Sequence, residues 1–133
     1  MEEGVFAILL RVYIEDTDAG GIVFYANYLK YFERARTELV RSKGFDLRSG
    51  LIDGVSYVVH SLEVKYLRPA LLDDMLSVSA TVTKVARTYF VVEQHVCNDA
   101  GVCLVTATVK VACVSYPDLK PKAIAEKLAS ALT

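Results

Sequence analysis

The order of helix-like and strand-like segments limits this chain of 133 residues to few folds. One strand-like segment precedes a single long helical repeat, and four more strand-like segments with short connections follow it. Short connections suit antiparallel neighbours, whereas parallel strands need long crossovers. The pattern therefore predicts an α+β protein in which a five-stranded antiparallel sheet wraps around one long central helix.

The predicted helix lies between two residues that commonly bound helices. Asn27 is the predicted N-cap and Gly44 the predicted stop, which gives a helix of about 16 residues. Its apolar side chains fall on one broad face, so that face should pack against the sheet. These apolar residues are Tyr28, Phe32, Ala35 and Leu39.

Alternating apolar and polar residues predict the strands. They cover residues 6–14, 55–67, 76–85, 88–97 and 102–114. A loop over residues 44–54 leads into the second strand, a hairpin turn spans residues 98–101, and a short helix is predicted over residues 122–132. In the second strand, the even-numbered apolar residues should be buried. They are Val58, Leu62, Val64 and Tyr66.

Composition narrows the classes of function. Apolar residues make up 53% of the chain, slightly above the usual share of about 45–50%, which favours a subunit interface. The net charge of −1 lacks the basic field that nucleic-acid binding needs. No apolar run approaches the length of a transmembrane helix, and the acidic opening residues do not resemble a secretory signal. We therefore expect residues 1–133 to form one cytoplasmic domain that binds neither nucleic acid nor a membrane.

The sequence gives little support for a metal or a disulfide framework. Cys97, Cys103 and Cys113 are odd in number and form no CxxC pair. A calcium loop counted from Asp16 would need oxygen ligands where Gly20 and Asn27 stand. We expect no metal and no cofactor.

Two carboxylates lie between the first strand and the helix. If the strand continued in phase, Asp16 and Asp18 would lie at the rim of its apolar face. A carboxylate there can act as nucleophile or general base, and the backbone N–H groups at a helix start can stabilise a carbonyl oxygen. The span therefore contains the two kinds of group that an acyl-transfer site needs, a carboxylate and backbone N–H donors. An aspartate before glycine is also a common turn residue, so chemistry alone leaves a structural role for Asp18 open.

The span RVYIEDTDAGGIV at residues 11–23 resembles the signature of hot-dog-fold thioesterases of the 4-hydroxybenzoyl-CoA thioesterase type. It is most similar to the YbgC-like acyl-CoA thioesterases associated with the Tol-Pal gene cluster. The likeness continues through FERARTE at 32–38, YLRPA at 66–70 and LKPK at 119–122, and covers nearly the whole chain. It implies a hot-dog fold, hydrolysis of an acyl-CoA, and active sites at the interface of a homodimer or homotetramer.

The resemblance also assigns residues. It implies that Asp18 acts on the thioester carbonyl as nucleophile or through a water, and that the Tyr25 backbone N–H polarises the carbonyl oxygen. Asp16 lies upstream of the reacting position and is interpreted as a structural group. Tyr25 stands where YbgC-like members often carry His and the hydroxybenzoyl type carries Tyr. Glu33 is interpreted as an exposed partner for Arg34, Arg36 or Lys30.

The CoA portion of the substrate is expected to bind the Arg87 cation and the Thr88 hydroxyl. Lys120 and Lys122 are weaker candidates for binding the CoA phosphates. The acyl group is expected to be short-chain aliphatic or aromatic. A hydratase of the same fold would carry a His near the helix, and none occurs between Met1 and Val59. A non-catalytic subunit that binds acyl-CoA or an acyl carrier protein is the alternative function.

Overall fold

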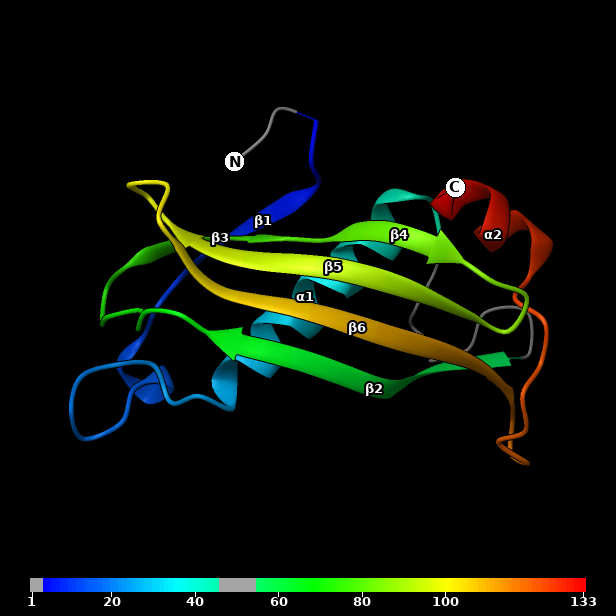
Figure 1. Cartoon of the computed structure of the whole chain (residues 1–133), viewed down its shortest axis with the longest axis horizontal. Coiled ribbons are helices and arrows are strands. Elements are labelled where there is room, and N and C mark those ends of the chain that lie inside the picture. Colours follow the sequence, from blue (N-terminus) through cyan, green and yellow to red (C-terminus); the bar gives the residue numbers. More distant parts are fainter. Residues whose placement is uncertain (1–3, 46–54) are drawn as a thin grey trace.

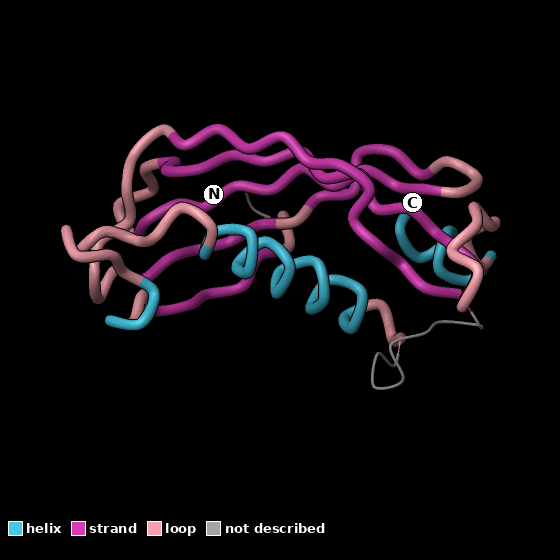
Figure 2. Tube along the Cα trace, turned by 90° about the horizontal axis from the view of Figure 1, so that it is seen from below, coloured by secondary structure: helices cyan, strands magenta, loops and turns pink. Residues whose placement is uncertain are grey.

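Six antiparallel strands form one sheet in the described part of the chain, and the long helix α1 lies along one face of it (Figures 1 and 2). The computed structural model describes residues 4–45 and 55–133. The strand order is β1-β3-β5-β6-β2, and β4 pairs with β5. In chain order the elements are β1 Ala7–Arg11, the 3₁₀ turn η1 Ile14–Asp16, α1 Asn27–Ser42, β2 Val55–Tyr66, β3 Met75–Ser79, β4 Thr81–Val85, β5 Tyr89–Asn98, β6 Cys103–Ser115 and α2 Glu126–Leu132.

The predicted α+β class and antiparallel sheet are confirmed, but one predicted strand is two. The segment over residues 76–85 breaks at Ala80, whose N–H donates to the Phe6 carbonyl oxygen at 3.0 Å. Before the break β3 pairs with β1 and β5, and after it β4 pairs with β5. Apolar alternation continues across Ala80, so the sequence pattern does not reveal the change of partner.

Helix α1 buries the predicted apolar face. Tyr31 is buried as well as the predicted residues, and all five face the sheet side of the molecule. The N-cap prediction is wrong: Ala26 is the N-cap and makes no side-chain cap bond, while Asn27 is the first helical residue. The predicted stop is confirmed, because Gly44 has a φ of +93° and its N–H donates to the Arg41 carbonyl oxygen at 2.9 Å.

Strand β2 does not bury the residues that its sequence indicates. Val58, Leu62 and Tyr66 are exposed and Val64 is half-buried, so this prediction is wrong. The register slips between Val59 and Ser61, which changes the face of the later residues. In addition β2 is an edge strand, and the helix does not cover its outer side. The predicted loop over 44–54 lies almost wholly outside the described residues.

The remaining elements close the far end of the sheet. The hairpin at residues 98–101 is confirmed by the Gly101 N–H bond to the Asn98 carbonyl oxygen at 3.0 Å. The predicted tail helix is shorter, as α2, and buries Leu128 and Leu132. All three cysteines are free thiols, and Cys113 is buried. None of the described helices is both long enough and apolar enough to span a bilayer.

Candidate active site

Asp18 lies in a tight turn between η1 and α1. Strand β1 ends at Arg11 and η1 then turns the chain, so the predicted strand phase does not extend to either aspartate. The turn is closed by two backbone bonds: Asp18 N–H to the Ile22 oxygen at 2.9 Å, and Gly21 N–H to the Asp18 oxygen at 3.1 Å. Gly21 has a φ of +79°, a value that favours glycine. The turn geometry, not a strand, therefore places Asp18.

The Asp18 carboxylate is exposed in the single protomer. Its Oδ1 accepts a hydrogen bond from the Gly20 N–H at 2.8 Å, which is the local bond of an aspartate turn. Among the described residues Oδ2 has no hydrogen-bond partner. One oxygen thus fixes the side chain while the other is free to meet a reactant.

Asp16 joins the turn to the helix start. Its Oδ2 accepts the Tyr13 N–H at 2.9 Å. Its carbonyl oxygen accepts two donors, the Phe24 N–H at 2.9 Å and Asn27 Nδ2 at 2.8 Å. These bonds hold the residues on either side of Tyr25 against the segment that leads into Asp18.

Tyr25 lies just before the first turn of α1. Its side chain is 63% exposed, and its ring contacts those of Phe24 and Tyr66 with centroids 4.8 and 6.2 Å away. The Tyr66 hydroxyl donates to the Tyr25 carbonyl oxygen at 3.2 Å. The Tyr25 N–H has no acceptor within the described part of the chain. It is a free donor at the positive end of a helix dipole.

Three further tyrosines surround this helix start, and burial raises the pKa of each. The Tyr28 hydroxyl accepts the Ala70 N–H at 2.9 Å. For Tyr31 the Asp16 carboxylate raises the pKa further, and the buried hydroxyl has no hydrogen-bond partner among the described residues. With Tyr66, these phenols stay protonated at neutral pH. Sequence spacing marked Tyr28 and Tyr66 only as core residues and did not single out Tyr31.

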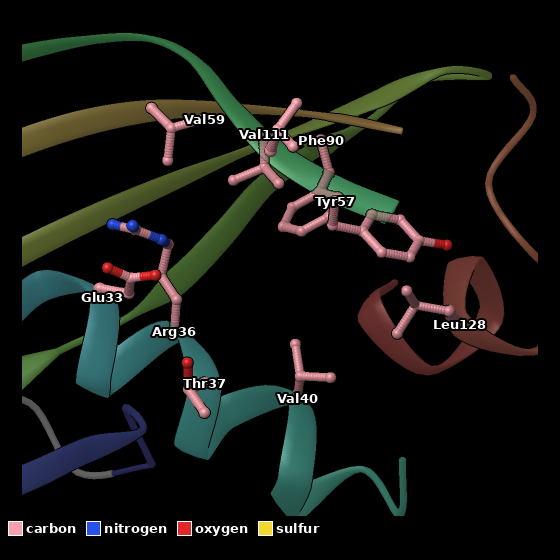
Figure 3. Close-up of a pocket in the computed structure, with 10 residues that line it drawn as sticks. Glu33, Arg36, Thr37, Val40, Tyr57, Val59, Phe90, Val111 and Leu128 are labelled. Carbon is pink, nitrogen blue, oxygen red and sulfur yellow. The ribbon is translucent and has the colours of Figure 1, made fainter. Parts of the chain in front are cut away.

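A groove runs between α1 and β2 from the first turns of the helix. Near the helix start it is a cavity of ≈ 130 Å³ with apolar walls that include Leu29, Leu62 and Val64. Farther along it widens into a cavity of ≈ 380 Å³, with Val40 and Leu128 at its far side (Figure 3). Both cavities share the same three lining residues, which shows that they adjoin. The shared residues are Glu33, Arg36 and Val59.

A buried polar network behind the groove, which holds Arg36, was missed from the sequence. Arg36 Nη1 donates to Gln94 Oε1 at 2.8 Å, and Gln94 is fully buried. Gln94 Nε2 donates to the carbonyl oxygens of Phe32 and Ser79 at 3.0 and 3.1 Å. The available signal was Gln94 itself, a polar side chain in phase with buried strand residues.

The residues expected to bind CoA gather at one end of β6. Cys113 is their common neighbour: its N–H donates to the Thr88 oxygen at 2.8 Å, and its oxygen accepts the Lys122 N–H at 3.0 Å. Arg87 and Lys120 lie beside these residues and are exposed. A cavity of ≈ 510 Å³ opens here, with Thr88, Tyr89 and Lys110 among its lining residues. The Lys110 ammonium lies 4.2 Å from the Tyr89 ring centroid, a setting that suits an anion and an aromatic base.

The turn between β1 and α1, which holds Asp18, and this cationic end of β6 lie at opposite ends of the sheet within one protomer (Figure 1). The Asp18 segment adjoins Ala70 through Val23, and Leu67 bonds to Leu104 at the start of β6. The expected CoA residues adjoin Cys113 near the end of β6. At about 3.3 Å per residue, these two points on the strand are about 30 Å apart.

Within residues 4–45 and 55–133, metal-binding side chains do not gather in groups of three or more. The expected metal-free chemistry stays a prediction.

Residues 20–105 match the family model described as "Thioesterase superfamily". The chain belongs to this superfamily. It is 38% identical over 128 residues to "Acyl-CoA thioester hydrolase YbgC" of Shigella flexneri, covering 96% of each chain. It is 40% identical over 132 residues to "Acyl-CoA thioesterase YbgC" of Haemophilus influenzae, covering 98% of this chain and 96% of the relative. A solved structure, a probable thioesterase from Bartonella henselae, has a TM-score of 0.80 at 31% identity and covers 92% of this chain and 100% of its own.

These matches confirm the predicted family, the hot-dog fold and the enzyme class, a thioester hydrolase. The predicted likeness to YbgC-type proteins is also confirmed.

Proposed function

We propose that this thioesterase hydrolyses an acyl-CoA, short-chain aliphatic or aromatic in its acyl group, to the free acid and CoA. The observation that supports this most strongly is the pairing of a carboxylate with an unused donor. Asp18 Oδ2 and the Tyr25 N–H both lack partners among the described residues, and Asp16 ties their segments together. The YbgC relatives that match along almost their whole length carry the acyl-CoA activity in their names.

In the proposed reaction the thioester carbonyl oxygen binds the Tyr25 N–H. Asp18 either takes a proton from a water that attacks the carbonyl carbon, or attacks that carbon itself. The negative charge that forms on the oxygen is stabilised by the Tyr25 N–H and the helix dipole. The C–S bond then breaks and CoA leaves as a thiolate, which takes up a proton. In the direct route, water afterwards hydrolyses the acyl–aspartate anhydride and regenerates Asp18.

The separation within one protomer leads us to propose a homodimer, alone or paired into a tetramer. CoA bound by Arg87, Thr88, Lys120 and Lys122 would lie at the opposite end of the sheet from Asp18, separated along β6 by about 30 Å of strand. A second copy related by a two-fold axis perpendicular to β2, with the two β2 strands antiparallel, would bring its own cationic end beside Asp18. Strand β2 suits this contact, because it is an edge strand with Val59, Leu62 and Tyr66 exposed.

Release of free thiol from short-chain, long-chain and aromatic acyl-CoAs tests the proposal. We expect Asp18→Asn to lower kcat by about a hundredfold or more, the usual range for loss of a general base. The matched control Asp99→Asn, in the exposed β5–β6 turn, should keep wild-type rates. Thiol release unchanged in Asp18→Asn would exclude the Asp18 mechanism. Binding without turnover on every thioester would favour the non-catalytic binding subunit instead.

A further inference from the structure

The groove beside α1 holds a cation at the junction of its two cavities. Arg36 lines both the narrow cavity beside the first turns of α1 and the wider one beyond. Its side chain points from the helix toward the sheet (Figure 3). The other walls are mainly apolar side chains of β2, β5 and β6. A chain that enters the groove beside the first turns of α1 and extends into the wider cavity must pass this guanidinium.

Arg36 is fixed in this position from behind. Gln94 is fully buried, and its amide is oriented by two main-chain acceptors, the Phe32 and Ser79 oxygens. Its Oε1 is therefore turned toward Arg36 and accepts Nη1 at 2.8 Å. Only one of the five guanidinium N–H donors is used by this bond. The remaining donors are available to an occupant of the groove.

The charge of Arg36 is poorly compensated. Burial lowers the pKa of Arg36, and Glu33 on the preceding turn acts in the opposite direction. Glu33 is the only carboxylate among the described residues that line either cavity, and it is exposed. In the described part of the chain no carboxylate forms an ion pair with Arg36. A half-buried cation that has no ion-pair partner and only the exposed Glu33 carboxylate acting on it is weakly stabilised, and an anion entering the groove would stabilise it further.

From these contacts we propose that the groove selects acyl groups that end in a carboxylate, which binds Arg36 while the thioester lies at Asp18 and Tyr25. This inference rests on the proposed acyl-CoA hydrolysis. The rise from Tyr25 to Arg36 along the helix is about 16 Å, and the arginine side chain leans back toward the helix start. An extended chain advances about 1.2 Å per bond, so the best carboxylate-ended acyl groups have about eight to twelve carbons. This inference therefore keeps the proposed hydrolysis of an acyl-CoA but replaces the short acyl chain that the family resemblance implies with a longer one.

The specificity is measured with pairs of acyl-CoAs of equal carbon number, one ending in a carboxylate and one in a methyl group. The pairs span about four to fourteen carbons. Wild type should prefer the carboxylate member at least tenfold in kcat/KM at the best length. Arg36→Met, which keeps the chain length and removes the charge, should lower this ratio at least tenfold and improve the methyl-terminated substrate. Arg41→Met, a matched change at an exposed position of the same helix, should leave the ratio unchanged.

The outcomes separate this inference from the proposed function. Turnover with no preference in wild type, or with the same ratio in Arg36→Met, overturns the role of Arg36 and leaves the hydrolase intact. An unchanged ratio together with weaker dimers in Arg36→Met would mean that Arg36 pairs instead with Glu33 of a second copy. If no acyl-CoA is turned over, the proposed function fails. In that case the paired acyl-CoAs are not consumed, and their binding to the protein can be measured directly. Equal dissociation constants for the carboxylate-ended and the methyl-ended acyl-CoA would then overturn the anion site at Arg36 as well.

Discussion

Asn27 Nδ2 donates a hydrogen bond of 2.8 Å to the carbonyl oxygen of Asp16. This bond joins the first residue of α1 to the segment that leads into the Asp18 turn. It therefore sets the position of the Tyr25 N–H relative to the carboxylate. Misplacement of reacting groups by about 1 Å can cost about a hundredfold in rate.

Asn27→Ala should lower kcat by about three- to tenfold and leave KM nearly unchanged, because the donor and the acid lose alignment while the groove is intact. The free energy of unfolding should fall by about 1 kcal/mol, the usual value of one hydrogen bond. Steady-state kinetics and urea unfolding measure both effects. Lys30→Ala, on the exposed side of the same helix turn, is the control. An equal loss of kcat in both variants would contradict a positioning role for Asn27.

Tyr25→Phe should keep kcat within about twofold of wild type, because the proposed oxyanion donor is the backbone N–H and not the phenol. The same thiol-release assay measures this. A loss of a hundredfold would mean that the hydroxyl takes part in the reaction, and the assignment of the donor would be wrong.

Gln94→Met should lower the free energy of unfolding by about 1–3 kcal/mol per acceptor or donor left unpaired in the core. The Phe32 and Ser79 oxygens and the Arg36 guanidinium each lose the hydrogen bond to Gln94. Urea unfolding measures the change, and His95→Met on the exposed face of the same strand is the control. Stability equal to wild type would show that the buried amide is dispensable.

The raised pKa of Tyr31 leads us to expect that the protein loses stability at high pH. The pKa of Tyr31 in the folded protein is raised above the ordinary value of 10.0 by burial and by Asp16, so the unfolded chain loses the phenol proton first. The contribution of the protonated Tyr31 phenol to the free energy of unfolding is complete below about pH 10. Above that pH it declines, by up to about 1.4 kcal/mol per pH unit. Tyr31→Phe should remove this decline and, by deleting an unpartnered buried hydroxyl, should be about 1 kcal/mol more stable at neutral pH.

Urea unfolding between pH 8 and about pH 11 checks the sign of this effect. The exposed Tyr13→Phe is the matched control. Parallel stability curves for wild type and Tyr31→Phe would contradict the raised pKa.

Local patterns predicted the helix and most of the sheet, because the apolar face of α1 and the hairpin at residues 98–101 depend on residues close in sequence. These predictions failed where backbone contacts between residues far apart in sequence determine the structure. The Phe6 bond at Ala80 splits one predicted strand, and the slip after Val59 together with the edge position of β2 exposes Leu62.

In the candidate site too, features that depend on local sequence were predicted and features that depend on distant contacts were not. Asp18 was found from its motif, but its placement depends on the η1 turn and not on strand phase. The expected CoA residues were identified by resemblance, and spacing alone could not reveal that they lie at the opposite end of the sheet. Arg36 lies among charged helix residues, so its position inside the groove became apparent only from its bond to Gln94.

The most direct test of the account is whether one active site uses two copies of the chain. Asp18→Asn and the double variant Arg87→Met, Lys122→Met are each expected to be nearly inactive. In a heterodimer purified through two different tags, a shared site would combine the intact Asp18 of one copy with the intact cations of the other. The account predicts about half of the wild-type activity, since one of the two symmetric sites is restored. A heterodimer as inactive as its parents would contradict it.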